Sequence, residues 1–351
     1  MLETARGKDL EQVLAEGAVG DPRLVPVISA VREIAMAAVE MAELVSLGLL
    51  AGEGGLAIGS VNSNGDIQKN LDLLANDLFV TALRQAPVAV VLSEEMREPI
   101  SLHEDAPLVV AIDPLDGSSN IDTNVSIGTI FSILPRIEGA GDLKTHFLQP
   151  GRAQLAAGFF IYGPQTALVL AFAERTRMFV LDRRKARFFE AIATVEIPDD
   201  SSEYAINTSN YRHWAPSIRA FIDDCVKGTE GPLRRNHNMR WIASLVAEAY
   251  RILNRGGVFL YPGDLRAGYS AGRLRLVYEA SPIALVMEYA GGAATDTVRA
   301  ILSLTPVDIH MRTPLVFGSR KIVNLVTRYH TDPQFSAERS PLFRQRGLIQ
   351  Q

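Results

Sequence analysis

An acidic segment that directly follows an apolar strand is the feature that most constrains how this chain folds and what it binds. The run DPLDGSSN occupies residues 113–120 and comes straight after Leu108–Ile112, whose branched apolar side chains are typical of a buried strand. Asp113 and Asp116 flank a proline that restricts the backbone of the expected turn. Together with the carbonyl of Leu115, the two carboxylates provide the oxygen ligands that hard divalent cations prefer. The run therefore predicts a site for one or two metal ions, and the competing interpretation is a solvated turn.

The second half of the same run is typical of an anion site. Gly117, Ser118 and Ser119 are expected to open a helix and to present successive backbone N–H groups. Such a nest of donors binds phosphate, and a divalent cation beside it polarises a phosphoryl group and activates water. The run as a whole therefore indicates metal-assisted hydrolysis of a phosphate ester rather than a simple helix cap.

A second acidic pair follows another predicted strand. Glu94 and Glu95 come after the apolar run 87–92, with only Ser93 between. Taken alone, adjacent glutamates usually belong to a solvated loop. Because the run 108–112 also ends in carboxylates, we expect two neighbouring strands to bring acidic groups to one site.

Three other acidic residues lie at the ends of predicted elements. Asp66 follows a Gly-rich stretch at about 50–66, which we predict to be a mobile loop, and it also suits the N-cap of the next helix. Asp72 lies early in that helix, and Glu279 follows the apolar run 274–277. Each is weak evidence alone, and its value depends on whether the fold brings it to the first acidic run.

The available residue types favour magnesium. The sequence has no His-x-His, Cys-x-x-Cys or His-Glu-x-x-His pattern, which argues against zinc, and it has no P-loop motif. Carboxylate and carbonyl ligands suit Mg2+ or Mn2+. We therefore expect two or more Mg2+ ions, for which Mn2+ can substitute.

Composition places the chain among ordinary folded proteins. Of its 351 residues, 47% are hydrophobic and 21% are charged, and the formal net charge is -5. This modest negative charge gives no reason to expect a nucleic-acid or membrane partner, and no apolar run approaches the roughly 20 residues that span a bilayer. The first residues are charged where a secretory signal is apolar, and the single cysteine, Cys225, allows no intrachain disulfide. A cytoplasmic location is the simplest expectation.

The hydrophobic pattern predicts an α/β (α+β) protein with helices and mixed sheets in layers. Apolar residues from Val27 to Val45 recur at helical spacing, and a second amphipathic helix is expected at about 67–84. Four strand-like runs between 129 and 189 are close enough together to form hairpins. Length and a change of pattern near 195 predict two domains, 1–194 and 195–351. In the second domain we expect strands near Tyr204, at 257–261 and near Leu315, and helices near Ala215, from Met239, at 281–292 with Ser281 as N-cap, and near Ile322.

Several motifs resemble, in order, those of the class I fructose-1,6-bisphosphatases. They are GD at 65–66, LD at 71–72, SEE at 93–95, DPLDGSSNID at 113–122, GGVFLYP at 256–262 and LRLVYE at 274–279. The resemblance spans about residues 25 to 325, and DPLDGSSNID is its most specific part, because the wider inositol-monophosphatase superfamily has shorter variants of it. The resemblance implies the layered αβαβα sugar-phosphatase fold and Mg2+-dependent hydrolysis of the 1-phosphate of fructose 1,6-bisphosphate. It also implies a homo-oligomer, expected to be a tetramer, and a place in gluconeogenesis or the Calvin cycle.

The resemblance further implies a role for each matching residue. The residues that would hold the metal ions are Glu94, Asp113, Leu115 through its carbonyl, Asp116 and Glu279. The residues that would position and deprotonate the attacking water are Asp66, Asp72 and Glu95. The substrate-binding residues would be Asp116, Gly117, Ser118 and Ser119 at the 1-phosphate, and Asn207, Tyr211, Tyr261 and Arg273 at the sugar and 6-phosphate. Arg240 would reach the 6-phosphate bound by a neighbouring subunit.

The chain departs from the family pattern at the sugar end. Arg273 stands where the family commonly has lysine, and Trp241 stands where a tyrosine commonly assists the 6-phosphate. Arginine offers a planar fork of donors, whereas lysine is a point charge. The segment 207–211 is one residue longer than the familiar pattern, so Asn210 is an alternative to Tyr211. These departures bear on substrate choice more than on metal chemistry.

Three other functions stay open. The first is a sedoheptulose-1,7-bisphosphatase or a bifunctional enzyme. The second, an inositol monophosphatase, is disfavoured because Arg240 and Arg273 indicate a second phosphate on the substrate. The third is a noncatalytic sugar-phosphate-binding regulator, which would lack the water-activating carboxylates, yet Asp66, Asp72 and Glu95 are present.

Inhibition by AMP is expected to be weak or absent. Family members that AMP inhibits typically carry Gly-Thr-Gly-Glu before the first long helix and Lys-Tyr at the start of the strand that leads to DPLDG. This chain has GDPR at 20–23 and Pro107-Leu108 at those places. Asp21 repels a phosphate, and Pro22 lacks an N–H donor.

Overall fold

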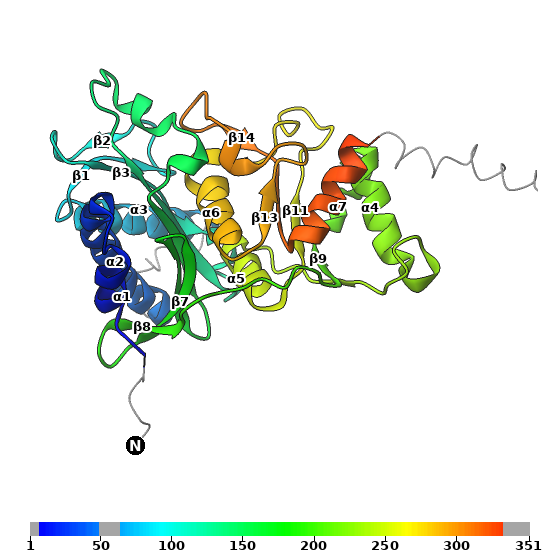
Figure 1. Ribbon diagram of the computed structural model, residues 1–351, viewed down its shortest axis with the longest axis horizontal. Helices are drawn as coiled ribbons and strands as arrows, with labels where there is room; N and C mark the ends of the chain where they lie inside the picture. Colours follow the sequence, from blue (N-terminus) through cyan, green and yellow to red (C-terminus); the bar gives the residue numbers. More distant parts are fainter. Residues whose placement is uncertain (1–6, 49–63, 333–351) are drawn as a thin grey trace, which may run out of the picture.

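Helices and sheets alternate in five layers, which run from left to right in Figure 1. The computed structural model describes residues 7–48 and 64–332, with the backbone alone at 64–70. The predicted αβαβα layering is confirmed, with N-terminal helices, a large sheet, two helices, a smaller sheet and two further helices. Most of the predicted mobile loop, at 49–63, lies outside the described residues.

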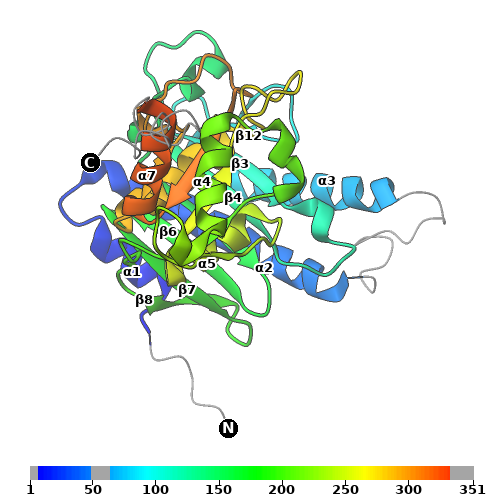
Figure 2. The ribbon, with the colours of Figure 1, turned by 90° about the vertical axis from the view of Figure 1, so that its right-hand side faces the viewer.

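The first layer consists of α1 (Leu10–Gly17), α2 (Val25–Leu47) and α3 (Asn64–Leu83). Both predicted long helices are therefore present. In α2, buried residues such as Val27, Val31 and Ile34 recur every three or four positions, which gives the helix one continuous apolar face. The helices α2 and α3 pack side by side (Figure 2).

Eight strands form the large sheet in the order β2-β1-β3-β4-β5-β6-β7-β8. Their bounds are β1 (Val88–Ser93), β2 (Ile100–Ser101), β3 (Leu108–Asp116), β4 (Ile127–Pro135), β5 (Ala156–Tyr162), β6 (Thr166–Phe172), β7 (Arg175–Asp182) and β8 (Arg187–Ile192). Strands β1 and β3 are parallel, and β3 to β8 are antiparallel, as the hairpin prediction requires. The region holds five strands after β3, one more than predicted. The central strands β3 and β4 are buried along almost their whole length because helices cover both faces of the sheet.

The remaining layers are formed by the second half of the chain. Helices α5 (Leu245–Arg255) and α6 (Ser281–Tyr289) lie between the two sheets (Figure 1). The smaller sheet has the order β10-β9-β11-β15-β13, with bounds β9 (Glu203–Ala205), β10 (Asn238–Met239), β11 (Val258–Tyr261), β13 (Ala293–Thr295) and β15 (Leu315–Gly318). Helices α4 (Pro216–Val226) and α7 (Arg320–Thr331) pack together over its far face (Figures 1 and 2). A separate ribbon pairs β12 (Leu274–Arg275) with β14 (Arg312–Thr313).

Two helix starts differ from the prediction. The helix expected from Met239 begins at Leu245, because Asn238–Met239 pairs with β9 and Ser244 then caps the helix. Ser281 is not an N-cap, because a π-helical turn, η8 (Leu276–Ala280), runs directly into α6 and Ser281 already has helical backbone angles. Among the described helices, none is long and apolar enough to cross a membrane.

Candidate active site

The acidic run of β3 forms a bulged strand instead of the predicted turn. β3 pairs with β4 at Asp113, which faces Ile130, and again at Asp116, which faces Gly128. β3 thus takes three residue steps where β4 takes two, so one extra residue is inserted. In a regular strand, residues three apart point to opposite faces, and one inserted residue reverses this. The bulge therefore brings both carboxylates to the same side of the sheet.

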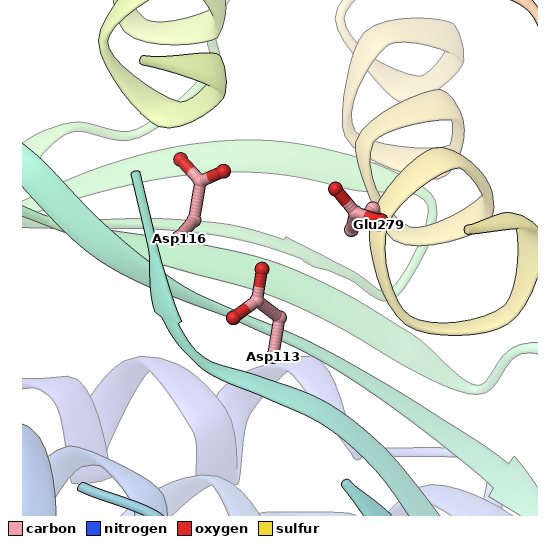
Figure 3. Close-up of side chains that lie close together, drawn as sticks. All are labelled: Asp113, Asp116 and Glu279. Atoms are coloured by element: carbon pink, nitrogen blue, oxygen red, sulfur yellow. The ribbon is translucent and has the colours of Figure 1, made fainter. Parts of the chain in front are cut away.

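Glu279 joins the two aspartates from a different element. It lies in η8, beyond the end of β12, and its Oε2 accepts a hydrogen bond from the N–H of Arg275 at 2.5 Å. Figure 3 shows the side chains of Asp113, Asp116 and Glu279 pointing toward one another. One oxygen of each lies within 4.8 Å of the others, and all three side chains are buried. A single divalent cation fits among three carboxylates at this separation.

Burial and mutual repulsion raise the pKa of each carboxyl in this cluster. The pKa of Asp113 lies well above its usual value because of burial and then of the charge on Glu94. Burial also raises the pKa of Asp116 to about 7, although the N–H of Val246, which donates to its Oδ2 at 3.0 Å, opposes the shift. The pKa of Glu279 is raised well above its usual value by burial and by Glu94. Carboxyls crowded in this way need a cation to be ionised together.

These raised values predict how pH changes the stability of the metal-free protein. Asp116, with a pKa of about 7, and Asp72, with a pKa of about 6, both lie above the value of about 4 for an unfolded aspartate. Between these values the folded protein binds more protons than the unfolded chain, so the free energy of unfolding falls as pH rises through this window. We expect the metal-free protein to melt at a lower temperature at about pH 8 than at about pH 5, and Mg2+ to stabilise it more at the higher pH. A melting temperature that rises over this window would contradict the crowded arrangement.

Glu94 and Glu95 extend the acidic site from the end of β1. Because β1 runs parallel to β3, the N–H of Glu94 donates to the carbonyl of Ile112 at 3.0 Å, and the two strands deliver acidic residues to one edge, as predicted. Glu94 lies close enough to Asp113 for its charge to raise the pKa of that carboxyl. Burial and the charge on Glu94 raise the pKa of Glu95. The acidic site therefore includes both glutamates.

Asp72 faces the same site from α3. Burial and then the charge on Glu95 raise its pKa to about 6, against a hydrogen bond from Ser118 that lowers it. Its other oxygen, Oδ1, is buried without a hydrogen-bond partner among the described residues. Asp66 lies in the first turn of α3, where the structure describes the backbone alone.

The predicted phosphate-binding residues follow Asp116 directly. Gly117 has a left-handed backbone with φ 76°, which glycine adopts without strain. The helix expected after it is a single 3₁₀ turn, η3 (Ser118–Asn120). Ser118 is half-buried and Ser119 is exposed, so this turn is open to an anion.

The N-terminus of α5 is a part of the site that the motifs did not indicate. The N–H of Val246, in its first turn, donates to Asp116, and Asn120 donates to the carbonyl of Ala243 at 2.9 Å. The helix dipole therefore lies against a carboxylate of the cluster. Ser244 in front of an amphipathic run is a usable sequence signal for this helix start, but the contact with Asp116 depends on the tertiary fold.

A hollow lies at the expected sugar end. The predicted residues that line it are Asn207, Tyr261 and Arg273. Asn210 also lines it, and its Oδ1 accepts a hydrogen bond from Arg266 at 3.0 Å. Tyr211 is not among the lining residues, because its hydroxyl donates to Asp223 at 2.7 Å. Of the two alternatives, the structure brings Asn210 to this hollow.

Arg240 lies outside this hollow. Its side chain is 53% exposed, and its Nε is 3.8 Å from a carboxylate oxygen of Glu203. The next residue, Trp241, stacks almost parallel to Tyr261, with ring centroids 6.4 Å apart. The structure thus places Arg240 at the surface, next to Trp241, which stacks on a residue that lines the hollow.

The donor set fits a hard divalent cation. The buried cluster provides carboxylate oxygens alone, with neither sulfur nor imidazole, and this favours Mg2+ or Mn2+ over zinc. The unpartnered Oδ1 of Asp72 is a further acceptor beside the cluster, available to a metal-bound water or to a cation.

Comparisons with known proteins agree with this geometry. The family model "Fructose-1-6-bisphosphatase, N-terminal domain" matches residues 11–192, and the model "Fructose-1-6-bisphosphatase, C-terminal domain" matches residues 197–331. The class 1 fructose-1,6-bisphosphatase of Rhizobium meliloti is 55% identical over 98% of this chain and 99% of its own length. That of Methylobacterium radiotolerans is 48% identical over 99% of both chains. The crystal structure of Leishmania major fructose-1,6-bisphosphatase in its holo form superposes with a TM-score of 0.83 at 30% identity, over 93% of this chain and 99% of that one.

The layered fold and its buried carboxylate cluster define the class as that of metal-binding sugar phosphatases. Within that class, the chain belongs to the fructose-1,6-bisphosphatase family.

Proposed function

We propose that this protein is a Mg2+-dependent phosphoric monoester hydrolase that removes the 1-phosphate of fructose 1,6-bisphosphate, giving fructose 6-phosphate and phosphate. The observation that carries the proposal is the convergence of Asp113, Asp116 and Glu279 within 4.8 Å, beside an open serine turn, in a member of this family. We further propose the division into a metal-binding domain, 1–194, and a sugar-binding domain, 195–351. The cytoplasm is the proposed location, since Cys225 is a buried free thiol.

The described residues have distinct parts in this reaction. Asp113, Asp116 and Glu279, with Glu94 and the Leu115 carbonyl, would hold two or more Mg2+ ions, with Mn2+ as a substitute. When bound, the metal ions polarise the phosphoryl group and lower the pKa of water.

The water is positioned by other carboxylates. Asp72, whose pKa of about 6 lies near neutrality, is suited to accept its proton. Glu95 adds a second acceptor, and Asp66 is proposed as the third carboxylate of this group. The turn Gly117–Ser119 binds the scissile phosphate through backbone N–H groups.

The far end of the substrate would be bound in the hollow at the sugar end. Asn207, Tyr261 and Arg273 surround it, and we propose Asn210 in place of Tyr211 as the fourth contact. Arg273 lies over the ring of Tyr269, with its guanidinium 4.9 Å from the centroid, and this contact restrains a planar fork that would bind a phosphate. We propose a homotetramer in which Arg240 reaches the 6-phosphate bound by a neighbouring subunit.

Phosphate release from a panel of sugar phosphates tests the proposed function. The panel contains fructose 1,6-bisphosphate, sedoheptulose 1,7-bisphosphate, fructose 6-phosphate and inositol 1-phosphate. We expect fructose 1,6-bisphosphate to have the highest kcat/KM, a chelator to stop release, and added Mg2+ to restore it. A higher kcat/KM for the sedoheptulose compound would replace the proposed substrate, and metal-independent release would refute the mechanism.

Weak or absent inhibition by AMP is a separate expected result. Asp21 caps the 3₁₀ turn η1 (Pro22–Leu24) and pairs with the guanidinium of Arg23 at 2.7 Å, so the neighbouring cation is already engaged by a carboxylate. We expect micromolar AMP at saturating Mg2+ to leave the rate unchanged, measured against inorganic phosphate as a product-inhibition control. Cooperative inhibition that is lost on substitution within 20–30 would show that a nucleotide binds here after all.

A further inference from the structure

The bulge that brings Asp113 and Asp116 together is held by side chains rather than by the backbone of β4. The peptide group that joins Pro114 to Leu115 lies between the two register positions, where no residue of β4 is paired with either. Its N–H donates to Oδ1 of Asp113 at 3.1 Å. Its carbonyl accepts a hydrogen bond from Oγ1 of Thr129 at 2.8 Å. One peptide group therefore connects a residue of the acidic cluster to a threonine of the next strand.

A second hydroxyl supports the first. Thr129 pairs with Phe160 of β5, and Tyr162 lies two residues further along, so Thr129 and Tyr162 project from the same face of the sheet. Their oxygens are 2.8 Å apart. A threonine hydroxyl can donate one hydrogen bond, and Thr129 donates it to the Pro114 carbonyl. In the hydrogen bond between the two hydroxyls, Tyr162 must therefore be the donor and Thr129 the acceptor. The chain of donors runs in one direction, from Tyr162 to Thr129 to the bulge.

We propose that Thr129 and Tyr162 are positioning residues that fix the peptide group between Pro114 and Leu115 and so hold the metal-binding residues of β3 in their binding geometry. This inference rests on the metal site of the proposed function. Neither residue is proposed to touch the metal or the substrate. Rotation of that peptide group would release Oδ1 of Asp113, a proposed metal ligand, and would disturb Leu115, whose carbonyl on the next peptide group is another.

Burial makes the hydroxyls of Thr129 and Tyr162 suited to holding this peptide group in place. Thr129 is 0% exposed and Tyr162 is 4% exposed, so water cannot replace either hydrogen bond. Burial also raises the pKa of Tyr162 far above its usual value, which keeps its hydroxyl protonated and able to donate. A valine at 129 would keep the shape of threonine and leave the Pro114 carbonyl unpaired.

The test compares Thr129→Val, Thr129→Ser and Tyr162→Phe by the Mg2+ concentration that gives half of the maximal rise in melting temperature. We expect Thr129→Val to need about 10-fold more Mg2+, which is the consequence of losing about 1.4 kcal/mol of binding free energy. Thr129→Ser keeps the donor and should stay within about twofold of the wild type, and Tyr162→Phe should fall between, near threefold. The Mg2+ dependence of phosphate release should shift in parallel, while the KM for the bisphosphate at saturating Mg2+ stays unchanged.

Thr176→Val is the matched control. Thr176 is also 0% exposed in the same sheet and also donates to a backbone carbonyl, that of Val286, at 2.7 Å. It should lower the melting temperature as Thr129→Val does without changing the Mg2+ midpoint. If Thr129→Val melts lower but keeps the wild-type midpoint, its role is structural alone and the proposal is overturned.

Two further outcomes are informative. If Thr129→Val does not fold, Tyr162→Phe decides, because a wild-type Mg2+ midpoint in that variant overturns the proposal. If Mg2+ fails to stabilise even the wild-type protein, the metal site of the proposed function is wrong, and the inference about Thr129 falls with it.

Discussion

Asp113→Asn is expected to reduce kcat by about 10³-fold or more while the protein stays folded. Loss of one carboxylate from the buried cluster removes a charge on which metal binding depends, and metal ions contribute several kcal/mol to stabilising a phosphoryl transition state. Since each 1.36 kcal/mol is tenfold in rate, a loss of about 4 kcal/mol accounts for an effect of this size. The measurement is phosphate release from fructose 1,6-bisphosphate across a range of Mg2+ concentrations.

The metal-free form of this variant provides a second readout. Asp113 is repelled by Glu94, Asp116 and Glu279 when no cation is bound. Replacement by a neutral amide removes that repulsion, so the metal-free variant should melt at least as high as the metal-free wild type and should gain less from added Mg2+. Asp182→Asn, at the end of β7, is the matched control and should change neither rate nor Mg2+ response. Full activity in Asp113→Asn would refute the proposed metal site.

The acidic site was largely predictable because its residues are clustered in sequence. The run 113–120 follows an apolar strand, and the pair Glu94-Glu95 follows another, so the expectation that two neighbouring strands end at one site was enough to bring them together. The structure adds that the two strands are parallel. What the run did not reveal is the bulge. A bulge is defined by the partner strand, and nothing within residues 113–116 says that β4 takes one step fewer.

The helical geometry near Glu279 was not predictable either, because it also depends on tertiary contacts and not on the local sequence. Three of the residues at 274–277 are branched and apolar, which favours a strand, and only Leu274–Arg275 forms one. The chain then enters a π-helical turn that continues into α6, and burial between the two sheets overrides the local preference. Ser281 lost its predicted role as N-cap as a result.

The sugar end was the least predictable part. Its residues come from separate elements, and the extra residue in 207–211 left Asn210 and Tyr211 indistinguishable by sequence. The structure separates them through their partners, since Asn210 is bonded to Arg266 and Tyr211 to Asp223. The proposed roles of Asp66 and Arg240 stay predictions.

Arg240→Ala is expected to raise the KM for fructose 1,6-bisphosphate by roughly 10- to 150-fold with little change in the inhibition constant for inorganic phosphate. The reason is the loss of a charge-assisted contact to the distal phosphate, of about 1.5–3 kcal/mol. Arg255→Ala is the matched control, because Arg255 also pairs with Glu203, at 3.1 Å, and is similarly exposed. If both variants raise KM equally, the effect comes from the unpaired Glu203, and the role of Arg240 in binding is wrong.

The position of Arg240 also indicates which subunit it would serve, and a mixed oligomer can test this. Arg240 is not among the described residues that line the hollow of its own chain, and its side chain is half-exposed beside Glu203. A contact with the 6-phosphate therefore favours a neighbouring subunit as the donor. When Arg240→Ala and Asp113→Asn subunits are dissociated and reassembled together, the Asp113→Asn subunit still supplies its arginine to a neighbour whose metal residues are intact. We expect that mixture to regain activity at low substrate concentration, where Asp113→Asn alone is nearly inactive and Arg240→Ala alone is slowed by its raised KM. A mixture no more active than the sum of its parts would place the arginine in its own subunit's site.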